Sequence, residues 1–229
     1  MRLAIMQPYF MPYLGYFQVM AAVDTYVVYD DVNYIKGGWV ARNNFLIGGE
    51  KKMFGIQLNG ASPNKLFSEI DIRDDFRKFL NMLRLNYKKA PFFDEVMPLM
   101  ERICAFEDKN LVAFYFNSYR EILDYLKVDT KLVLSSTLDK DCSLHAQDKV
   151  LDICRCLGAT QYINAIGGQE LYSREAFKER GVRLNFLRTD DIVYNQFGGD
   201  FVPGLSIVDV LMFGRAQGTR ELLGCYSLI

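Results

Sequence analysis

The chain opens with short apolar runs separated by polar turns. Residues 3–6 form an apolar run that stops before a proline, which predicts a buried strand ending in a turn. A helix over residues 13–22 should follow, and residues 25–29 (Thr-Tyr-Val-Val-Tyr) are typical of a second strand, which delivers the Asp30-Asp31 pair at its carboxyl end. Loops or hairpin tips are expected at residues 36–39 and 48–50, with a strand over residues 52–58.

The middle of the chain has a helical pattern. From residue 74 to residue 127 the apolar positions recur at three- and four-residue spacing. The Ala90-Pro91 pair separates the first helix from a shorter one over residues 93–106. We expect residues 74–127 to form a helical insertion within one domain of residues 1–229.

The last third alternates between strand and helix patterns. Gly158 and Gly181 follow the two helices, where a left-handed C-cap favours glycine. This alternation predicts an α/β fold with a predominantly parallel sheet and helical crossovers. The expected elements are a strand over 131–134, a helix over 145–157, a strand over 160–164, a helix over 173–180 and a strand over 182–186.

Composition narrows the classes of function. Half of the 229 residues are hydrophobic, so the chain can bury a core without disulfides or metals. The net charge of -1 gives no global attraction to nucleic acid or to an anionic membrane. The 5 cysteines lack zinc-ligand spacing, and no metal site is expected. No apolar stretch reaches the length of a signal-peptide core or a membrane span, so we expect a cytoplasmic protein.

The turn after the first strand is the first candidate for ligand binding. Residues 7–16 hold two prolines, a glycine and four aromatic side chains, and the following helix offers free amides to a phosphate or carboxylate. Tyr13-Leu14-Gly15-Tyr16 resembles the HxGH signature of nucleotidylyltransferase-type (HUP-like) folds, with tyrosines at both histidine positions. The alternative is a proline-stiffened turn whose aromatic residues belong to the core.

The second candidate combines carboxylates with an arginine and the single tryptophan. The Asp30-Asp31 pair can act as a base, bind hydroxyl groups or hold a hard cation, and Arg42 can clamp a phosphate or carboxylate. A solvated acidic turn neutralised by the arginine is the alternative. Trp39 either stacks on a ligand ring or caps the core.

Two later loops complete the candidates. Gly167 and Gly168 follow a strand and should open a helix, so their amides can approach an anion, although a glycine-rich turn without a ligand is the alternative. In the loop over residues 194–209, Ser206 and Asp209 have the spacing of a capping box.

The sequence does not favour a catalytic histidine. His145 is the only histidine, and it lies at an expected helix start, where surface or capping roles are usual. If the protein is an enzyme, an Asp, Tyr, Lys or Arg side chain is expected to do the chemistry.

Four ordered segments together resemble the WbqC-like family, from Leu3 to about Gly214. They are Gln7-Pro8 with residues 12–17, residues 30–32 with Trp39 and Arg42-Asn43, residues 157–160 with Tyr162, and residues 201–203 with 205–207 and Asp209. One departure is Asn164-Ala165-Ile166, where a Ser-Gly pair is expected. The resemblance points to these site positions: Gln7, Pro8, Tyr13, Gly15, Asp30, Asp31, Trp39, Arg42, Asn43, Gly167, Gly168, Tyr172, Tyr194, Gln196 and Asp209.

The family resemblance implies a bacterial transferase of surface-polysaccharide (O-antigen) or related biosynthesis, acting on an amino sugar nucleotide or another activated small molecule. Asp30 or Asp31 would be the base, Arg42 would bind an acidic group, and the amides near Gly15 and Gly168 would cradle a phosphate or thioester. A non-catalytic nucleotide or sugar-nucleotide binding module and a nucleotidyltransferase-like enzyme are the alternatives. No cofactor is identified; the expected partners are a small anionic molecule and a second copy or a biosynthetic-complex protein, not nucleic acid.

Overall fold

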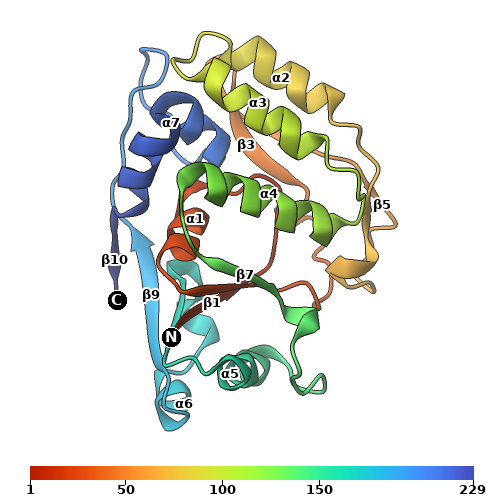
Figure 1. The fold of residues 1–229 in the computed structure, drawn as a ribbon, viewed down its shortest axis with the longest axis vertical. Helices are drawn as coiled ribbons and strands as arrows, with labels where there is room; N and C mark the ends of the chain where they lie inside the picture. Colours follow the sequence, from red (N-terminus) through yellow and green to blue (C-terminus); the bar gives the residue numbers. More distant parts are fainter.

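The short apolar runs of the sequence form a six-stranded central sheet in the computed structural model, which describes residues 1–229 (Figure 1). Its strand order is β10-β9-β8-β1-β2-β7, and only β10 pairs antiparallel to its neighbour. The fold is therefore mixed α/β with a mostly parallel sheet. The strands are β1 (Arg2–Met6), β2 (Thr25–Val28), β7 (Lys131–Leu134), β8 (Gln161–Ala165), β9 (Arg183–Thr189) and β10 (Tyr226–Leu228).

Helices cover both faces of the sheet, so its strands are buried on both sides. Along β1, Leu3 and Ile5 face a core shared with α5 (Ala146–Leu157) and α6 (Arg174–Glu179). Ala4, between them, faces the larger core. Figure 1 shows α5 and α6 on one side of the sheet and α4 and α7 on the other. The helices of the larger core are α1 (Leu14–Ala21), α2 (Arg77–Tyr87), α3 (Phe93–Cys104), α4 (Leu111–Leu126) and α7 (Ile207–Leu223).

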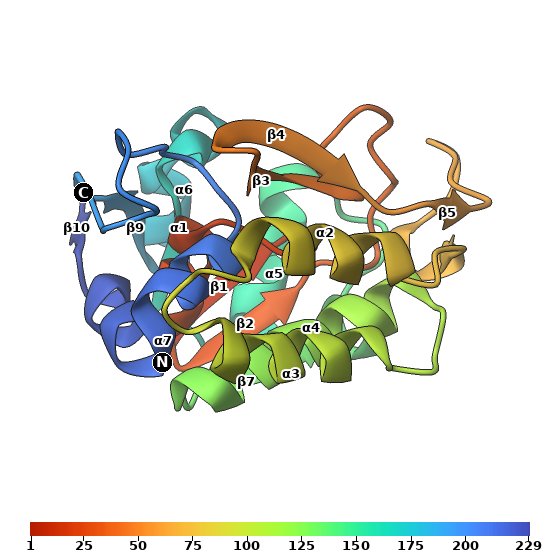
Figure 2. The ribbon, with the colours of Figure 1, turned by 90° about the horizontal axis from the view of Figure 1, so that it is seen from above.

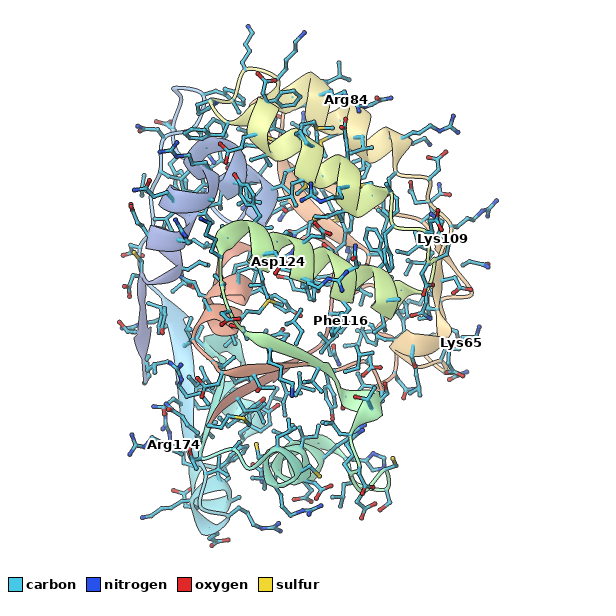
Figure 3. The ribbon with its side chains drawn as sticks, viewed as in Figure 1. Lys65, Arg84, Lys109, Phe116, Asp124 and Arg174 are labelled. Atoms are coloured by element: carbon cyan, nitrogen blue, oxygen red, sulfur yellow. The ribbon has the colours of Figure 1, made fainter.

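The segment between β2 and β7 packs onto the larger core. Figure 2 shows a hairpin, α2, α3 and α4 lying one beside the next in this order, and Figure 3 shows Arg84 of α2 on the outer surface. None of the helices combines the length and the apolar character that crossing a membrane requires. The remaining elements are β3 (Arg42–Ile47), β4 (Glu50–Gly55), β5 (Leu58–Asn59), β6 (Asp71–Ile72) and the 3₁₀ turns η1 (Phe67–Glu69), η2 (Ser135–Thr137) and η3 (Ile166–Leu171).

Most predicted elements are confirmed to within a few residues, and the differences have physical causes. The strand expected over 52–58 is β4, and its partner β3 was missed because it begins with the polar run Arg42-Asn43-Asn44. Gly167 and Gly168 lie inside η3 instead of opening an α-helix. Strand β10 was not expected either, since three residues carry too little periodicity.

The turn between β1 and α1 is held by a side chain from the helical middle. The Tyr119 hydroxyl of α4 accepts a hydrogen bond from Tyr9 N at 2.8 Å and donates one to Tyr9 O at 2.8 Å. The Tyr115 hydroxyl, one turn earlier, donates to Val40 O at 2.6 Å, and Phe10 N donates to the same carbonyl. Helix α4 therefore anchors the turn and the segment beside it.

The same turn contains a strained residue. Met11 has φ = 43°, in the left-handed region that side chains other than glycine rarely adopt. Its carbonyl accepts hydrogen bonds from Asn43 Nδ2 at 2.6 Å and from the Ser206 hydroxyl at 2.8 Å. These contacts stabilise the conformation from β3 and from the start of α7.

Replacing Tyr119 with phenylalanine should destabilise the protein by about 1–3 kcal/mol, because both peptide groups of Tyr9 lose their partner. Urea denaturation measures this loss. Tyr125→Phe is the matched control: its hydroxyl donates to the exposed Glu95 carboxylate, so the change should stay within about 0.5 kcal/mol. Equal losses in the two variants would contradict the anchoring role of Tyr119.

Candidate ligand-binding site

The chain reverses its direction of winding at β1. One crossover, through α1, leads from β1 to its neighbour β2, whereas β8, on the other side of β1, is reached through α5. The carboxyl ends of β1 and β8 therefore lie at a topological switch point, where open α/β sheets bind their ligands.

A cavity of about 700 Å³ opens at this point, and we call it the switch-point cavity. Its volume lies in the range of small-molecule sites. Of its 21 lining residues, 14 are hydrophobic, and none is Asp, Glu, Lys, Arg or His. It is lined by residues 5–9, Tyr13, Tyr16, Tyr29, Ile35, residues 38–40, Ala146, Gln147, Val150, Asn164, Ala165, Gly167, Gly168, Leu171 and Tyr172.

Large apolar side chains are exposed at the mouth of this cavity. Tyr13 is 40% exposed, Ile35 and Trp39 are each 50% exposed, and Leu171 is 67% exposed. Exposed apolar groups that gather at one cavity mark a surface that a ligand can cover. The walls thus favour a ligand with an apolar or aromatic part.

The Tyr13-Leu14-Gly15-Tyr16 motif splits into two roles. The Tyr13 ring lies beside Gly15, where a Cβ atom would be 2.5 Å from Tyr13 Cε2. Tyr16 is fully buried, and its hydroxyl donates to Gln7 O at 3.0 Å. Gly15 thus leaves room for the Tyr13 ring, while Tyr16 supports the turn from below.

The two glycines of η3 also differ. A Cβ at Gly168 would lie 2.4 Å from Asn164 Nδ2, so close packing requires glycine there. At Gly167 a Cβ would meet nothing within 4 Å. Asn164 uses its Oδ1 to accept from Ala165 N at 2.9 Å, and its Nδ2 forms no hydrogen bond within the protein. Gly167 and the Asn164 amide are therefore available to a ligand.

The Asp30-Asp31 pair does not line the cavity. Asp30 is buried and its Oδ1 accepts from Ser136 N at 2.9 Å. Asp31 Oδ2 lies 2.8 Å from Lys140 Nζ and 3.1 Å from Lys149 Nζ. Burial opposes ionisation of Asp31, but the ammonium groups of Lys140 and Lys149 hold its pKa below the usual value. This geometry is that of a buried ion-pair cluster, not of a free base facing the cavity.

Arg42 and Asn43 also lie outside the lining of the cavity. The Arg42 guanidinium donates to Gly38 O at 3.0 Å and to Gly37 O, and it forms no ion pair with a carboxylate. Asn43 uses Nδ2 on the turn carbonyls and Oδ1 on Asn44 N. Both side chains are committed to the protein's own peptide groups.

Tyr194 and Gly15 line a second cavity of about 480 Å³, which shares Tyr13 with the first. Asp190 and Asp191 are its charged lining residues. The other lining residues are Leu14, Thr189, Ile192, Val193, Phe201, Pro203, Gly204, Leu205 and Val210.

Asp209 and Gln196 line neither cavity. Asp209 is fully buried, and its Oδ2 accepts from the Tyr194 hydroxyl at 2.6 Å and from Gln196 Nε2 at 2.9 Å. Half of the predicted capping box is wrong: Ser206 caps α7 by accepting from Val208 N, but Ser206 N donates to Asn44 O and not to Asp209. The Asp209 carboxylate instead holds the loop that walls the second cavity.

Of the predicted residues, Gln7, Pro8, Tyr13, Trp39, Gly167, Gly168 and Tyr172 meet at the switch-point cavity. Sequence reasoning missed Tyr29, Ile35, Ala146, Gln147 and Leu171. Ala146 and Gln147 begin α5, whose N-cap His145 makes no side-chain hydrogen bond, as is also true of Tyr13 at α1. The expected helix start at His145 was the available signal. No group of three His, Cys, Asp or Glu side chains is arranged to hold a metal ion.

Comparison with known proteins gives a family and one relative. The WbqC-like protein family matches residues 7–221. The chain is similar to the "Uncharacterized protein Rv1507c" of Mycobacterium tuberculosis, with 27% identity over 229 residues that cover 98% of each chain. No solved structure matches the chain.

The two η3 glycines should respond differently to alanine. Gly168→Ala should cost about 1–3 kcal/mol of stability, because its Cβ overlaps the Asn164 amide. Gly167→Ala should stay within about 0.5 kcal/mol, because its Cβ enters open space. Chemical denaturation compares them, and a Gly167→Ala loss as large as that of Gly168→Ala would be inconsistent with this geometry.

The Asp209 carboxylate should make stability fall as pH rises. Burial raises its pKa, so the folded state binds the proton more tightly than the unfolded state. The wild type therefore becomes less stable as pH rises above about 4. Asp209→Asn lacks this carboxylate, so its stability relative to wild type should increase over the same rise in pH.

Urea midpoints measured from about pH 2.5 to about pH 8 test this slope and include the range in which carboxyl groups become protonated. Asp75→Asn is a contrast of opposite sign, because hydrogen bonds from the Arg77 backbone and side chain lower the pKa of Asp75. The stability of Asp75→Asn relative to wild type should improve as pH falls below about 4. Asp75 of the unfolded wild type then binds a proton more readily than Asp75 of the folded state. A pH-independent difference between Asp209→Asn and wild type would rule out the raised pKa.

Proposed function

Because the chain belongs to the WbqC-like protein family, we propose that it binds an activated small molecule of the nucleotide or sugar-nucleotide class in the switch-point cavity and transfers a group from it. The observation that carries the proposal is the 700 Å³ cavity at the carboxyl ends of β1 and β8. Its position and size fit such a ligand, and the strand winding is compatible with kinship to HUP-like folds. The link to surface-polysaccharide synthesis rests on the family resemblance alone.

The chemistry of the walls supports a ligand with a ring and an anionic group. The aromatic and aliphatic side chains of the lining suit the ring. The lining residues Tyr13 and Ala146 lie at the N-termini of α1 and α5. Neither start has a side-chain cap, unlike α4 and α7, so amides remain free there. Free helix N-terminal amides favour phosphate or carboxylate.

The second cavity supports group transfer. It meets the first at Tyr13, so a donor and an acceptor can occupy adjoining sites. Asp190 and Asp191 along its wall suit an acceptor that carries an amine, such as an amino sugar.

A non-catalytic binding module is the second candidate. The observation in its favour is that no acidic, basic or imidazole side chain lines the switch-point cavity. Asp30 and Asp31 are engaged elsewhere, which weakens their proposed role as a base. The nucleotidyltransferase alternative has less support, because the buried Tyr16 hydroxyl is committed to Gln7 O.

A thermal-shift panel of UDP-N-acetylglucosamine, dTDP-glucose, GDP-mannose and ADP-glucose tests the proposal. A fitting compound at 100 times its Kd should stabilise the protein by about 2.7 kcal/mol and raise its Tm. Gly167→Val should abolish this rise, because Gly167 lines the cavity and nothing within 4 Å keeps the added side chain out of it. Gly199→Val is the matched control, since a Cβ at Gly199 also meets nothing within 4 Å but lies outside the cavity.

Turnover separates the two candidates. A transferase should consume the stabilising compound when amino sugars are added as acceptors, whereas a binding module leaves it intact. If no panel member raises the Tm, or if both valine variants respond like the wild type, the proposed site is wrong.

A further inference from the structure

We propose that Arg42 is a positioning residue that holds Trp39 at the mouth of the switch-point cavity, where the indole stacks on the base of a bound nucleotide. The stacking half of this inference rests on the proposed function. The positioning half stands on the contacts of Arg42 in the protein without ligand, so the two can be tested separately.

The Arg42 guanidinium spans the segment that carries Trp39. Its Nε donates to Gly38 O at 3.0 Å, a terminal nitrogen donates to Gly37 O, and its central carbon lies 5.9 Å from the Trp39 ring centroid. The Arg42 backbone N–H also donates to Trp39 O at 2.9 Å. A planar fork suits two neighbouring carbonyls in a way that a lysine ammonium does not.

Val40, which follows Trp39, is held by the Tyr115 hydroxyl and by Phe10 N, whereas the residues before Trp39 have few contacts besides those with Arg42. Gly37 has φ = 78°, a conformation that favours glycine, and a Cβ there would meet nothing within 4 Å. Gly38 N donates to Ile35 O within the same loop. Arg42 is therefore the side chain that holds the loop on the amino-terminal side of Trp39, while Tyr115 holds Val40 on the other side.

The Trp39 ring has a surface left for a ligand. Arg42 lies over the ring, yet half of the Trp39 surface remains exposed at the cavity. A lining without charged side chains suits a planar, neutral ring. Aromatic side chains stack on nucleobases of every type, because each base has a π-face.

Trp39 is the only tryptophan, so fluorescence excited at the long-wavelength edge, where the 14 tyrosines do not absorb, reports on this loop alone. In the protein without ligand, Arg42→Ala should increase acrylamide quenching of Trp39 roughly twofold, and Arg42→Lys should behave like Arg42→Ala. Arg84→Ala is the control: Arg84 pairs with Glu101 on α2 and α3, outside the cavity, and its loss should leave quenching unchanged (Figure 3). Unchanged quenching in Arg42→Ala overturns the positioning role.

Binding of the four sugar nucleotides and of their free nucleosides tests stacking. The compound that raises the Tm should quench Trp39 fluorescence, and Trp39→Ala should weaken its binding roughly tenfold. Arg42→Ala should weaken the binding of the nucleoside and the binding of the sugar nucleotide by the same factor. The double variant should bind no more weakly than Trp39→Ala, because Arg42 acts through Trp39.

Each contrary result has a defined meaning. If Arg42→Ala weakened the binding of the sugar nucleotide but not that of the nucleoside, Arg42 would contact the phosphate directly, and this result would overturn the inference. A compound that raises the Tm without changing Trp39 fluorescence would overturn stacking while the proposed function stands. A panel without any Tm rise would count against both the proposed function and stacking, and acrylamide quenching would still decide the role of Arg42.

Discussion

The cavity depends on how the turn between β1 and α1 satisfies its buried peptide groups. A turn enclosed by other elements cannot leave these groups to water, so each needs a partner within the protein. Tyr119 of α4 serves both peptide groups of Tyr9, and Asn43 and Ser206 serve the carbonyl of the strained Met11. Three elements distant in the chain therefore hold one wall of the switch-point cavity, and the helical middle of the chain belongs structurally to that cavity.

Charge is organised around the cavity and not within it. Asp31 is paired with Lys140 and Lys149, and Lys149 lies 5.1 Å from the Tyr29 ring, whose residue lines the cavity. Arg42 likewise binds peptide carbonyls beside the cavity. Because these ionised groups lie behind the wall, a ligand in the proposed site would not desolvate them. Rings, amides and backbone dipoles would then recognise it.

Sequence patterns predicted the architecture well, and some of the predicted site residues meet at one cavity. The apolar runs and the strand–helix alternation were strong signals because a parallel sheet buries both faces of its strands. Gln7, Pro8, Trp39 and Gly167 lie together at the switch-point cavity, since residues that follow parallel strands share one edge, and their contact with a ligand stays a prediction. The roles of Asp30, Asp31 and Arg42 were not predictable, because a side chain's partner depends on which distant segment packs beside it.

The amino-acid sequence alone determined the α/β class, the parallel alternation and the edge of the sheet at which polar turns collect, because these follow from local periodicity and strand direction. Tertiary structure alone decided which of those turns line the cavity. Gly15 and Gly168 illustrate the reason, because neither has a positive φ. Gly15 is required by the Tyr13 ring and the Thr189 hydroxyl packed against it, and Gly168 is required by the Asn164 amide. Contacts of this kind depend on how the chain packs in three dimensions, so the periodic pattern of residues along the chain does not reveal them.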